Sequence, residues 1–213
     1  MKTDLAPKPN YQIILDNILK QIALSGAVPR LLLHACCAPC SSYVLEYLSE
    51  YFDITVFYYN PNISPESEYR YRTDELIRLV NEQPHKNPVR VVEGRYDPAE
   101  FEAVAKGREN DPEGGGRCRL CYELRLREAA KTAADGGYDF FTTTLSISPY
   151  KNAGWLNEIG AALAEEYGVA YLFSDFKKRG GYRRSIELSA EYGLYRQNFC
   201  GCVYSRREAE SRR

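Results

Sequence analysis

The amino-acid sequence predicts an α/β fold in which helices cover both faces of a parallel, Rossmann-like sheet. Short apolar runs, typical of buried strands, alternate along the chain with longer segments whose apolar residues recur at helical spacing. Turns rich in Gly, Pro, Ser and Asn separate these segments, and right-handed crossovers between successive strands would make the strands parallel. Because the pattern contains no internal repeat and no convincing second domain, we expect a single domain over residues 1–213.

The first expected elements are a helix, a strand and a second helix. Region 1–29 should hold an N-terminal helix, because Ile and Leu side chains recur at helical spacing over 11–24. Residues 30–35 form a short, nearly continuous apolar run, as in a strand that is buried on both faces. The cysteine-containing loop 36–42 would then lead into a helix over 43–51.

The same criteria assign the remaining elements. Further strands are expected at 53–59, 89–92, 139–145 and 169–173, and further helices at 66–82, 98–106, 118–134, 152–167 and 181–192. In open α/β sheets, ligands bind beyond the carboxyl ends of the strands. Polar loops follow four of the expected strands, at 36–40, 60–63, 146–152 and 174–179. We therefore expect the functional site at this edge of the sheet.

The composition indicates a globular protein. The chain has 213 residues, 28 basic and 29 acidic side chains and 44% hydrophobic residues, which excludes a disordered chain, a collagen-like repeat and a disulfide-dense mini-protein. No apolar run approaches the ~18 residues that span a bilayer, and the N-terminus lacks the apolar core of a secretion signal. We therefore expect a cytoplasmic location and no membrane partner.

Charge is unevenly distributed along the chain. Residues 174–213 form a basic C-terminal segment with ten basic and five acidic side chains, although the whole chain has a net charge of −1. Such a segment, in a chain with 18 tyrosines, is suited to bind phosphate groups and to stack bases. A solvated helix face with a charged tail explains the same pattern without any partner.

Five cysteines occur in two motifs that are typical of metal ligands. Cys36, Cys37 and Cys40 lie in a strand-to-helix loop, and Cys118 and Cys121 form a CxxC motif where a helix begins. A helix N-terminus favours the thiolate, the form that binds soft metals. One zinc ion or one iron–sulfur cluster needs four ligands, so one sulfur is in excess. Isolated buried cysteines and a structural zinc site are alternatives, but the position at the ligand-binding edge favours a redox-active or Lewis-acidic metal.

The remaining cysteines form a CxC motif. Cys200 and Cys202 are either further metal ligands or a thiol pair that cycles through a disulfide and relays electrons, and we favour the redox pair. His34 precedes the first cysteines on the buried strand, where a hydrogen bond from its ring would tune a metal centre. His85 is expected at the surface.

Five motifs, taken together and in order, resemble those of a known family. They are LLLHACCAPCSS (31–42), NPNIxPxxEYxxR (60–72), RCxxCYxxRL (117–126), TTLSISPYKN (143–152) and YRQNFCGCVYS (195–205). With these motifs the chain resembles the epoxyqueuosine reductase QueH family. The resemblance implies a cobalamin-independent oxidoreductase that reduces epoxyqueuosine to queuosine at the wobble position of tRNA, the last step of queuosine biosynthesis. It also implies a 4Fe-4S cluster, a second metal ion (iron) close by, an electron donor, and a sheet related to the adenine-nucleotide α-hydrolase fold.

The resemblance also implies roles for individual residues. By motif position, Cys36, Cys37, Cys118 and Cys121 would hold the cluster, and Cys40 would bind the second metal. This is consistent with the chemistry, because removal of an epoxide oxygen as water requires two electrons and the chain has no GxGxxG fingerprint for a dinucleotide.

Protons and tRNA contacts must come from other side chains. Tyr150, Lys151 and Asp175 are the candidate proton donors, because all three are expected near the carboxyl ends of strands. The expected phosphate contacts are Lys177, Lys178, Arg179, Arg183, Arg184 and Arg196. Tyr182 or Tyr195 would stack a flipped anticodon base.

Two other functions would explain parts of the pattern. A PP-loop-like enzyme that uses ATP to modify tRNA would have its phosphate loop after the first strand, but Pro39 has no N–H group to offer a phosphate there. A zinc-stabilised tRNA-binding module would use the same cysteines without catalysis.

Overall fold

A computed structural model describes residues 9–212 of the chain. Residues 1–8 and 213 lie outside this description, so the first part of region 1–29 and Arg213 of the basic segment are not placed. The helices are α1 (Tyr11–Ser25), α2 (Ala38–Leu48), α3 (Glu66–Glu82), α4 (Pro98–Ala105), α5 (Gly116–Asp135), α6 (Ala153–Tyr167), α7 (Gly181–Glu191) and α8 (Val203–Ser211), with short 3-10 turns η1 (Thr144–Ile147) and η2 (Lys178–Gly180). The strands are β1 (Arg30–His34), β2 (Asp53–Tyr58), β3 (Val89–Glu93), β4 (Phe140–Thr143) and β5 (Ala170–Tyr171).

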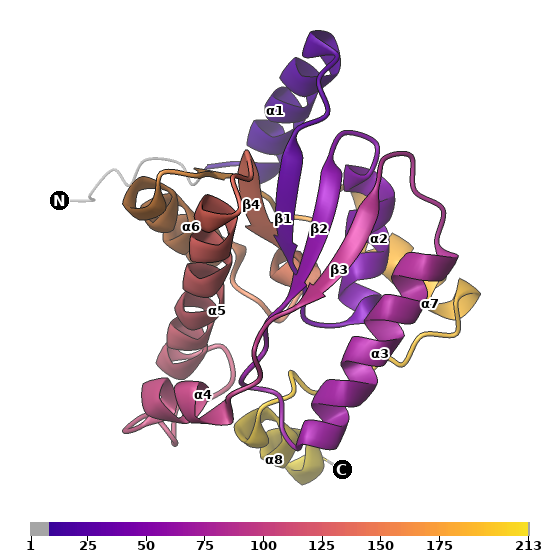
Figure 1. The fold of residues 1–213 in the computed structure, drawn as a ribbon. Helices are drawn as coiled ribbons and strands as arrows, with labels where there is room; N and C mark the ends of the chain where they lie inside the picture. Colours follow the sequence, from indigo (N-terminus) through magenta and orange to yellow (C-terminus); the bar gives the residue numbers. More distant parts are fainter. Residues whose placement is uncertain (1–8, 213) are drawn as a thin grey trace, which may run out of the picture.

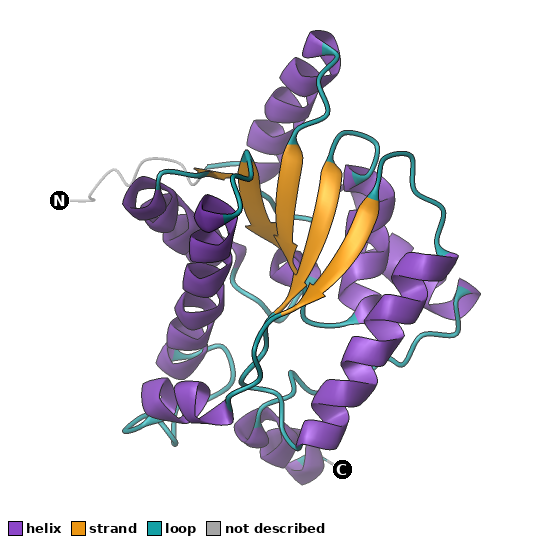
Figure 2. Cartoon of the chain, in the orientation of Figure 1, coloured by secondary structure: helices purple, strands orange, loops and turns teal. Residues whose placement is uncertain are grey.

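The strands form one parallel sheet in the order β3-β2-β1-β4-β5. Helices cover both faces of this sheet, as Figures 1 and 2 show. The prediction of an α/β, Rossmann-like fold is therefore confirmed. No helix within the described part of the chain is both long and apolar enough to cross a membrane.

Alternate residues of the strands build two cores. Leu31 and Leu33 of β1 pack with the buried faces of α1, α2 and α3. Leu32 points to the opposite face and packs with α5 and α6, for example against Leu126 and Leu156. The buried apolar side chains on both faces of β1 explain why its sequence lacks a polar alternation.

Elements α2, β4 and α8 differ from the sequence prediction, and β5 covers only Ala170–Tyr171 of the expected 169–173. Helix α2 begins at Ala38 rather than 43, because Pro39 lies in its first turn, where a missing N–H group breaks no helical hydrogen bond. Strand β4 ends at Thr143, whose side chain accepts a hydrogen bond from the Leu145 N–H and starts η1. Helix α8 was not predicted, since its residues are mostly polar and have no apolar period.

The strand order places a crevice at the carboxyl end of the sheet. The chain leaves β1 toward α2 on one face, and it leaves β4 toward η1 and α6 on the other face. Adjacent strands whose connections diverge in this way leave an opening between their ends, which is where α/β proteins bind ligands. Figure 1 shows α8 beyond the arrowheads of the strands, below this opening.

Candidate metal centre

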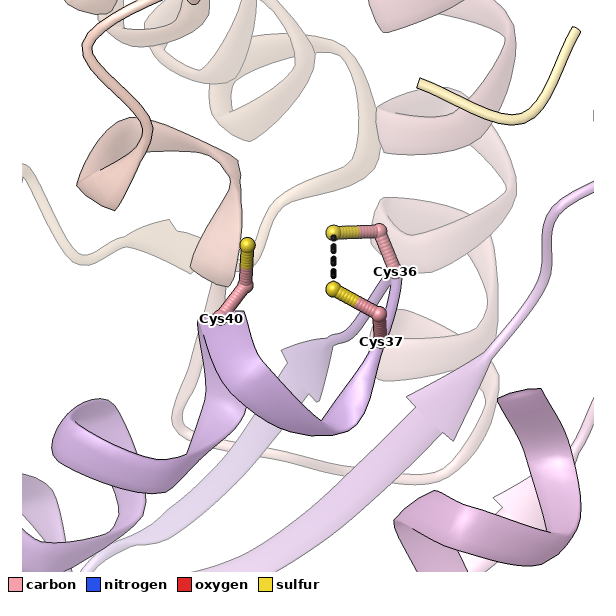
Figure 3. Close-up of side chains that lie close together, drawn as sticks. All are labelled: Cys36, Cys37 and Cys40. Atoms are coloured by element: carbon pink, nitrogen blue, oxygen red, sulfur yellow. Dashed lines mark hydrogen bonds between the residues drawn. The ribbon is translucent and has the colours of Figure 1, made fainter. Parts of the chain in front are cut away.

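Cys36, Cys37 and Cys40 form a compact sulfur group at the crevice. Their three Sγ atoms all lie within 4.8 Å of one another, and the Cys36 and Cys37 sulfurs are 3.8 Å apart. Figure 3 shows the three side chains pointing toward one another from the end of β1 and the first turn of α2. The Cys36 sulfur also lies 3.9 Å from the Thr144 hydroxyl, so the group faces the start of η1 across the crevice. Soft metal ions prefer such a set of sulfur ligands.

Local backbone geometry explains this arrangement. Cys37 is the extended N-cap residue of α2, and Cys40 follows three residues later, so the first helical turn brings the two side chains to the same side. Hydrogen bonding with Cys36 and Cys40 lowers the pKa of Cys37 well below its usual value, and Arg72 acts in the same direction. Hydrogen bonding with Cys36 and Cys37 raises the pKa of Cys40. The group therefore favours one thiolate, at Cys37.

The other four cysteines form a second sulfur group. Cys118, Cys121, Cys200 and Cys202 line a small cavity of about 10 Å³. The first two lie one turn apart on α5, and Cys202 is the N-cap of α8, where its sulfur accepts a hydrogen bond from the Ser205 N–H. Burial raises the pKa of Cys121 to about 12, so a bound cation is needed to make this thiol a thiolate near neutral pH.

A larger cavity connects the two sulfur groups. It has a volume of about 320 Å³, and Cys36, Cys37, Cys40, Cys200 and Lys151 all line it. Cys200, Lys151 and Glu113 line the small cavity as well. The structure therefore brings Cys200 of the CxC motif to the same cavity as the first sulfur group, while Cys118, Cys121 and Cys202 line only the small cavity. Joint ligation of one cluster by Cys36, Cys37, Cys118 and Cys121 stays a prediction.

The surroundings of one buried arginine indicate whether an anionic metal centre fits at this site. Arg125 is 1% exposed, donates hydrogen bonds to the carbonyl oxygen of Cys121 and the amide oxygen of Asn60, and has one amino group, Nη2, without a partner. Within residues 9–212, no carboxylate lies at ion-pair distance from it. A buried cation without a counter-charge is costly in free energy. Thiolates bound to a metal would supply the negative charge that Arg125 lacks. The residues present therefore fit a thiolate-ligated metal.

A second buried arginine fixes the CxC motif. Arg72 is 2% exposed, pairs with Glu68 at 2.7 Å and donates a hydrogen bond of 3.1 Å to the carbonyl oxygen of Cys200. Its guanidinium also lies over the ring of Phe199. Between the two cysteines, Gly201 has a φ angle of +122°, and an added Cβ would lie 2.9 Å from the Ile63 side chain. The motif can therefore reach its place only with glycine in the middle.

No disulfide joins the predicted redox pair in this structure. All seven cysteines, including Cys200 and Cys202, carry free thiols. A cycle through a Cys200–Cys202 disulfide stays a prediction.

His34 holds the strand ends beside the first sulfur group. Its ring nitrogens lie 2.9 Å from the Thr143 hydroxyl and 3.0 Å from the Tyr59 carbonyl oxygen. Burial lowers the pKa of His34 to about 4, and Arg125 adds to this effect, so the ring is neutral. The ring joins the residue that follows β2 to the end of β4, and both ring nitrogens have partners there. The predicted hydrogen bond from His34 to a metal centre stays a prediction. His85, predicted at the surface, is half-buried and contacts the Val80 carbonyl oxygen.

The structure separates the three candidate proton donors. Lys151 is 8% exposed, lines both cavities and lies 3.4 Å from Glu113. Burial acts to lower its pKa, but Cys200 and Tyr122 outweigh burial and the pKa is raised. Tyr150 lies at the mouth of the larger cavity and is 74% exposed. Asp175 pairs with Lys177 and is not among the residues that line this cavity.

Most of the predicted tRNA-binding side chains make ion pairs within the protein. The pairs are Lys177–Asp175, Arg179–Asp16, Arg183–Glu187 and Arg184–Glu46. Arg196 lines the larger cavity, as does Tyr182, and donates a hydrogen bond to the Ser189 hydroxyl. Tyr195 instead packs against Tyr71. The internal pairs neutralise much of the positive charge that the composition indicated, and Arg196 is the predicted contact nearest the sulfur groups.

Sequence reasoning missed several residues of the site. Asn62, Tyr122 and Arg125 line the small cavity, and Arg72 and Asn60 support it. The signal was available on α5, where Cys118, Cys121, Tyr122 and Arg125 share one helix face at spacings of three and four. A charged side chain on the buried face of a helix, one turn after a CxxC motif, indicates a partner in the interior.

Comparison with known proteins gives a consistent result. The family model described as epoxyqueuosine reductase QueH matches residues 31–208. A protein named epoxyqueuosine reductase QueH from Staphylococcus epidermidis is 45% identical over 93% of this chain and 85% of its own length. Proteins of the same name from Streptococcus pyogenes serotype M1 and Thermotoga maritima are 44% and 38% identical, over 92% and 82% of this chain and 80% and 88% of their own lengths.

Proposed function

The chain belongs to the epoxyqueuosine reductase QueH family, and on that premise we propose that it reduces epoxyqueuosine to queuosine at the wobble position of tRNA. This would be the last, cobalamin-independent step of queuosine biosynthesis, in the cytoplasm. The observation that carries the proposal is the larger cavity, because the first sulfur group, Cys200 and Lys151 all face it. A redox centre and a cation beside one open cavity are what a reductive removal of oxygen requires.

The reaction has a simple electron balance. Both C–O bonds of the epoxide break, a C=C bond forms, and the oxygen leaves as water after taking up two electrons and two protons. A 4Fe-4S cluster held by cysteines of the two sulfur groups, with a second iron near Cys40, would supply the electrons and polarise the oxygen. An external electron donor must then restore the centre.

Lys151 is the residue of this chain best placed to assist departure of the oxygen. Its buried ammonium group lines the cavity with Cys37 and Cys200, and its raised pKa keeps it protonated. A positive charge held in a site of low dielectric stabilises negative charge that develops on the leaving oxygen. Tyr150 at the cavity mouth is the second candidate to deliver a proton, and the position of Asp175 away from the cavity gives it a lower rank.

The mouth of the cavity suits a nucleotide. Tyr182 and Arg196 line it and lie close to the sulfur groups, so the aromatic ring can stack a flipped base while the guanidinium binds a phosphate. The remaining predicted contacts, Lys177, Lys178, Arg179, Arg183 and Arg184, would bind the tRNA backbone farther out, and their acidic partners would have to be displaced.

The function is tested by reconstitution. Protein loaded anaerobically with iron and sulfide is mixed with tRNA that contains epoxyqueuosine and a strong reductant, and the nucleosides are then analysed. We expect brown protein and conversion to queuosine. Lys151→Met should lower the rate by at least about 100-fold, whereas Lys131→Met, at an exposed position of α5, should not change it. Iron-loaded protein that leaves the nucleoside intact would overturn the proposal. Colourless zinc protein would favour the tRNA-binding module, and tRNA-dependent ATP hydrolysis would favour the PP-loop-like enzyme.

A further inference from the structure

Several buried polar atoms around the small cavity have no hydrogen-bond partner. They are both amide atoms of Asn62, the Tyr122 hydroxyl, Nη2 of Arg125 and Nε of Arg117, whose guanidinium already donates to two backbone carbonyl oxygens. Asn62, Tyr122 and Arg125 are 2%, 1% and 1% exposed, respectively, and all line the cavity with the four cysteines of the second sulfur group. Since buried polar groups in folded proteins are almost always paired, such a set in one place needs an explanation.

One water molecule is not enough to satisfy all of these groups. A cavity of about 10 Å³ is at the lower limit for one water molecule. A single water accepts two hydrogen bonds, whereas Asn62, Tyr122 and Arg125 offer at least three donors to this space. The surplus donors therefore indicate acceptors in the wall of the cavity that carry negative charge, because Arg125 brings an uncompensated positive charge.

We propose that Asn62, Tyr122 and Arg125 donate hydrogen bonds to the sulfur atoms of the metal centre and thereby raise its reduction potential. The inference rests on the proposed metal centre. The acceptors that line the cavity with these donors include the sulfurs of Cys118, Cys121, Cys200 and Cys202, which become strong acceptors when they are thiolates on a metal. The cavity is also lined by Glu113 and Ser205, but the Glu113 carboxylate pairs with Lys151 and the Ser205 hydroxyl is hydrogen-bonded to Cys202. Each reduction adds negative charge to the centre, so donors and a nearby cation stabilise the reduced form more than the oxidised form.

Tyr122→Phe is the sharpest test, because it removes one oxygen atom that the metal-free fold does not use. In protein loaded with iron and sulfide, the midpoint potential should shift to a more negative value, while the metal content stays at that of the wild type. In metal-free protein, the melting temperature should not fall. These two readouts separate a donor to the metal centre from a residue that only supports the fold.

Tyr171 provides a matched control. It is also a buried tyrosine whose hydroxyl has no hydrogen-bond partner, but it belongs to β5, packs against α6 and does not line either cavity. Tyr171→Phe should leave the midpoint potential unchanged. Asn62→Leu, a second variant, should shift the potential in the same direction as Tyr122→Phe.

The outcomes distinguish this inference from the proposed function. If the wild type binds iron but neither Tyr122→Phe nor Asn62→Leu shifts the potential, the inference is wrong and the proposed reductase is unaffected. A lower melting temperature of metal-free Tyr122→Phe would likewise contradict it, because the hydroxyl would then serve the fold. A wild type that binds no iron overturns both. Protein that binds iron and shows the shifts without reducing the nucleoside overturns the proposed function alone.

Discussion

The two sulfur groups are built in different ways. Cys36, Cys37 and Cys40 come from five consecutive residues at the end of β1 and the start of α2, so local backbone geometry brings them together. Cys118 and Cys121 on α5 meet Cys200 and Cys202 across about 80 residues of sequence, and only tertiary packing holds them in place. The first group should therefore persist when distant contacts are lost, and the second should not.

The supporting residues reflect the same difference. The first group depends on the N-terminus of α2 and on a hydrogen bond from Asn60 to the Ala35 carbonyl oxygen. The second depends on Arg72, which reaches from α3 to the Cys200 carbonyl oxygen, and on the backbone of Gly201. A metal bound by both groups would couple a rigid local site to a segment that a few long-range contacts position.

Loss of a cysteine gives the largest expected effect and shows whether the groups share one centre. Cys37→Ala removes the thiol with the most lowered pKa and should weaken metal binding by more than about 100-fold. If Cys118→Ala removes the same iron and sulfide, both groups hold one centre. Analysis of iron and sulfide in each purified variant decides this. Retention of full metal content by both variants would contradict a metal site at these cysteines.

Arg72→Met tests the long-range support of the second group. The change breaks a buried ion pair and removes the hydrogen bond to Cys200, so the free energy of unfolding should fall by about 3–5 kcal/mol. Arg70→Met is the matched control, two residues earlier on α3, where the ion pairs are about half exposed and a loss of at most about 1 kcal/mol is expected. Urea unfolding of the metal-free proteins measures both. Equal losses of unfolding free energy in the two variants would mean that burial does not strengthen the contribution of Arg72 to stability.

The features that could be predicted from the sequence are those that local contacts determine. The parallel sheet with helices on both faces and the closeness of Cys36, Cys37 and Cys40 were predictable, because the alternation of strands and helices and the geometry of one helical turn determine them. The order of the strands was not predicted. The CxxC motif on α5 and the CxC motif could also be recognised from the sequence, as a metal-binding motif and as a redox pair or further metal ligands.

The rest depends on side chains that meet across the fold. Arg184 and Glu46 are 138 residues apart, so their ion pair could not be foreseen and the basic segment seemed more positive than it is. The position of Cys200 between the two cavities depends on α8 and on the Arg72 contact, neither of which has a periodic signal. The contact of Arg125 with Asn60, 65 residues away in the sequence, could not be foreseen either.

A fall in pH should destabilise the folded protein through His34, which lies beside the first sulfur group. The folded protein holds the pKa of this buried ring at about 4, below its ordinary value of 6.5, so the unfolded chain binds a proton that the folded protein does not. The stabilisation is complete above pH 6.5 and is lost as pH falls toward 4, by on the order of 3 kcal/mol. Urea unfolding of metal-free protein across this range measures the slope. His34→Gln should lack that part of the slope, and an unchanged slope would mean that another group causes it.

The smallest expected effect is the difference in stability between variants of two nearby, fully buried asparagines. Asn60 lies beside the first sulfur group, and Asn62 lines the cavity of the second. Asn60 donates a hydrogen bond of 2.8 Å to Ala35, next to the first group, and accepts one from Arg125, whereas neither amide atom of Asn62 has a partner. In metal-free protein, Asn60→Leu leaves two buried groups unpaired and should cost about 1–3 kcal/mol, whereas Asn62→Leu should be neutral or slightly stabilising. Chemical denaturation measures both values. A comparable loss for Asn62→Leu would mean that the metal-free fold already uses this amide, and the second group would then be as fully supported without metal as the first.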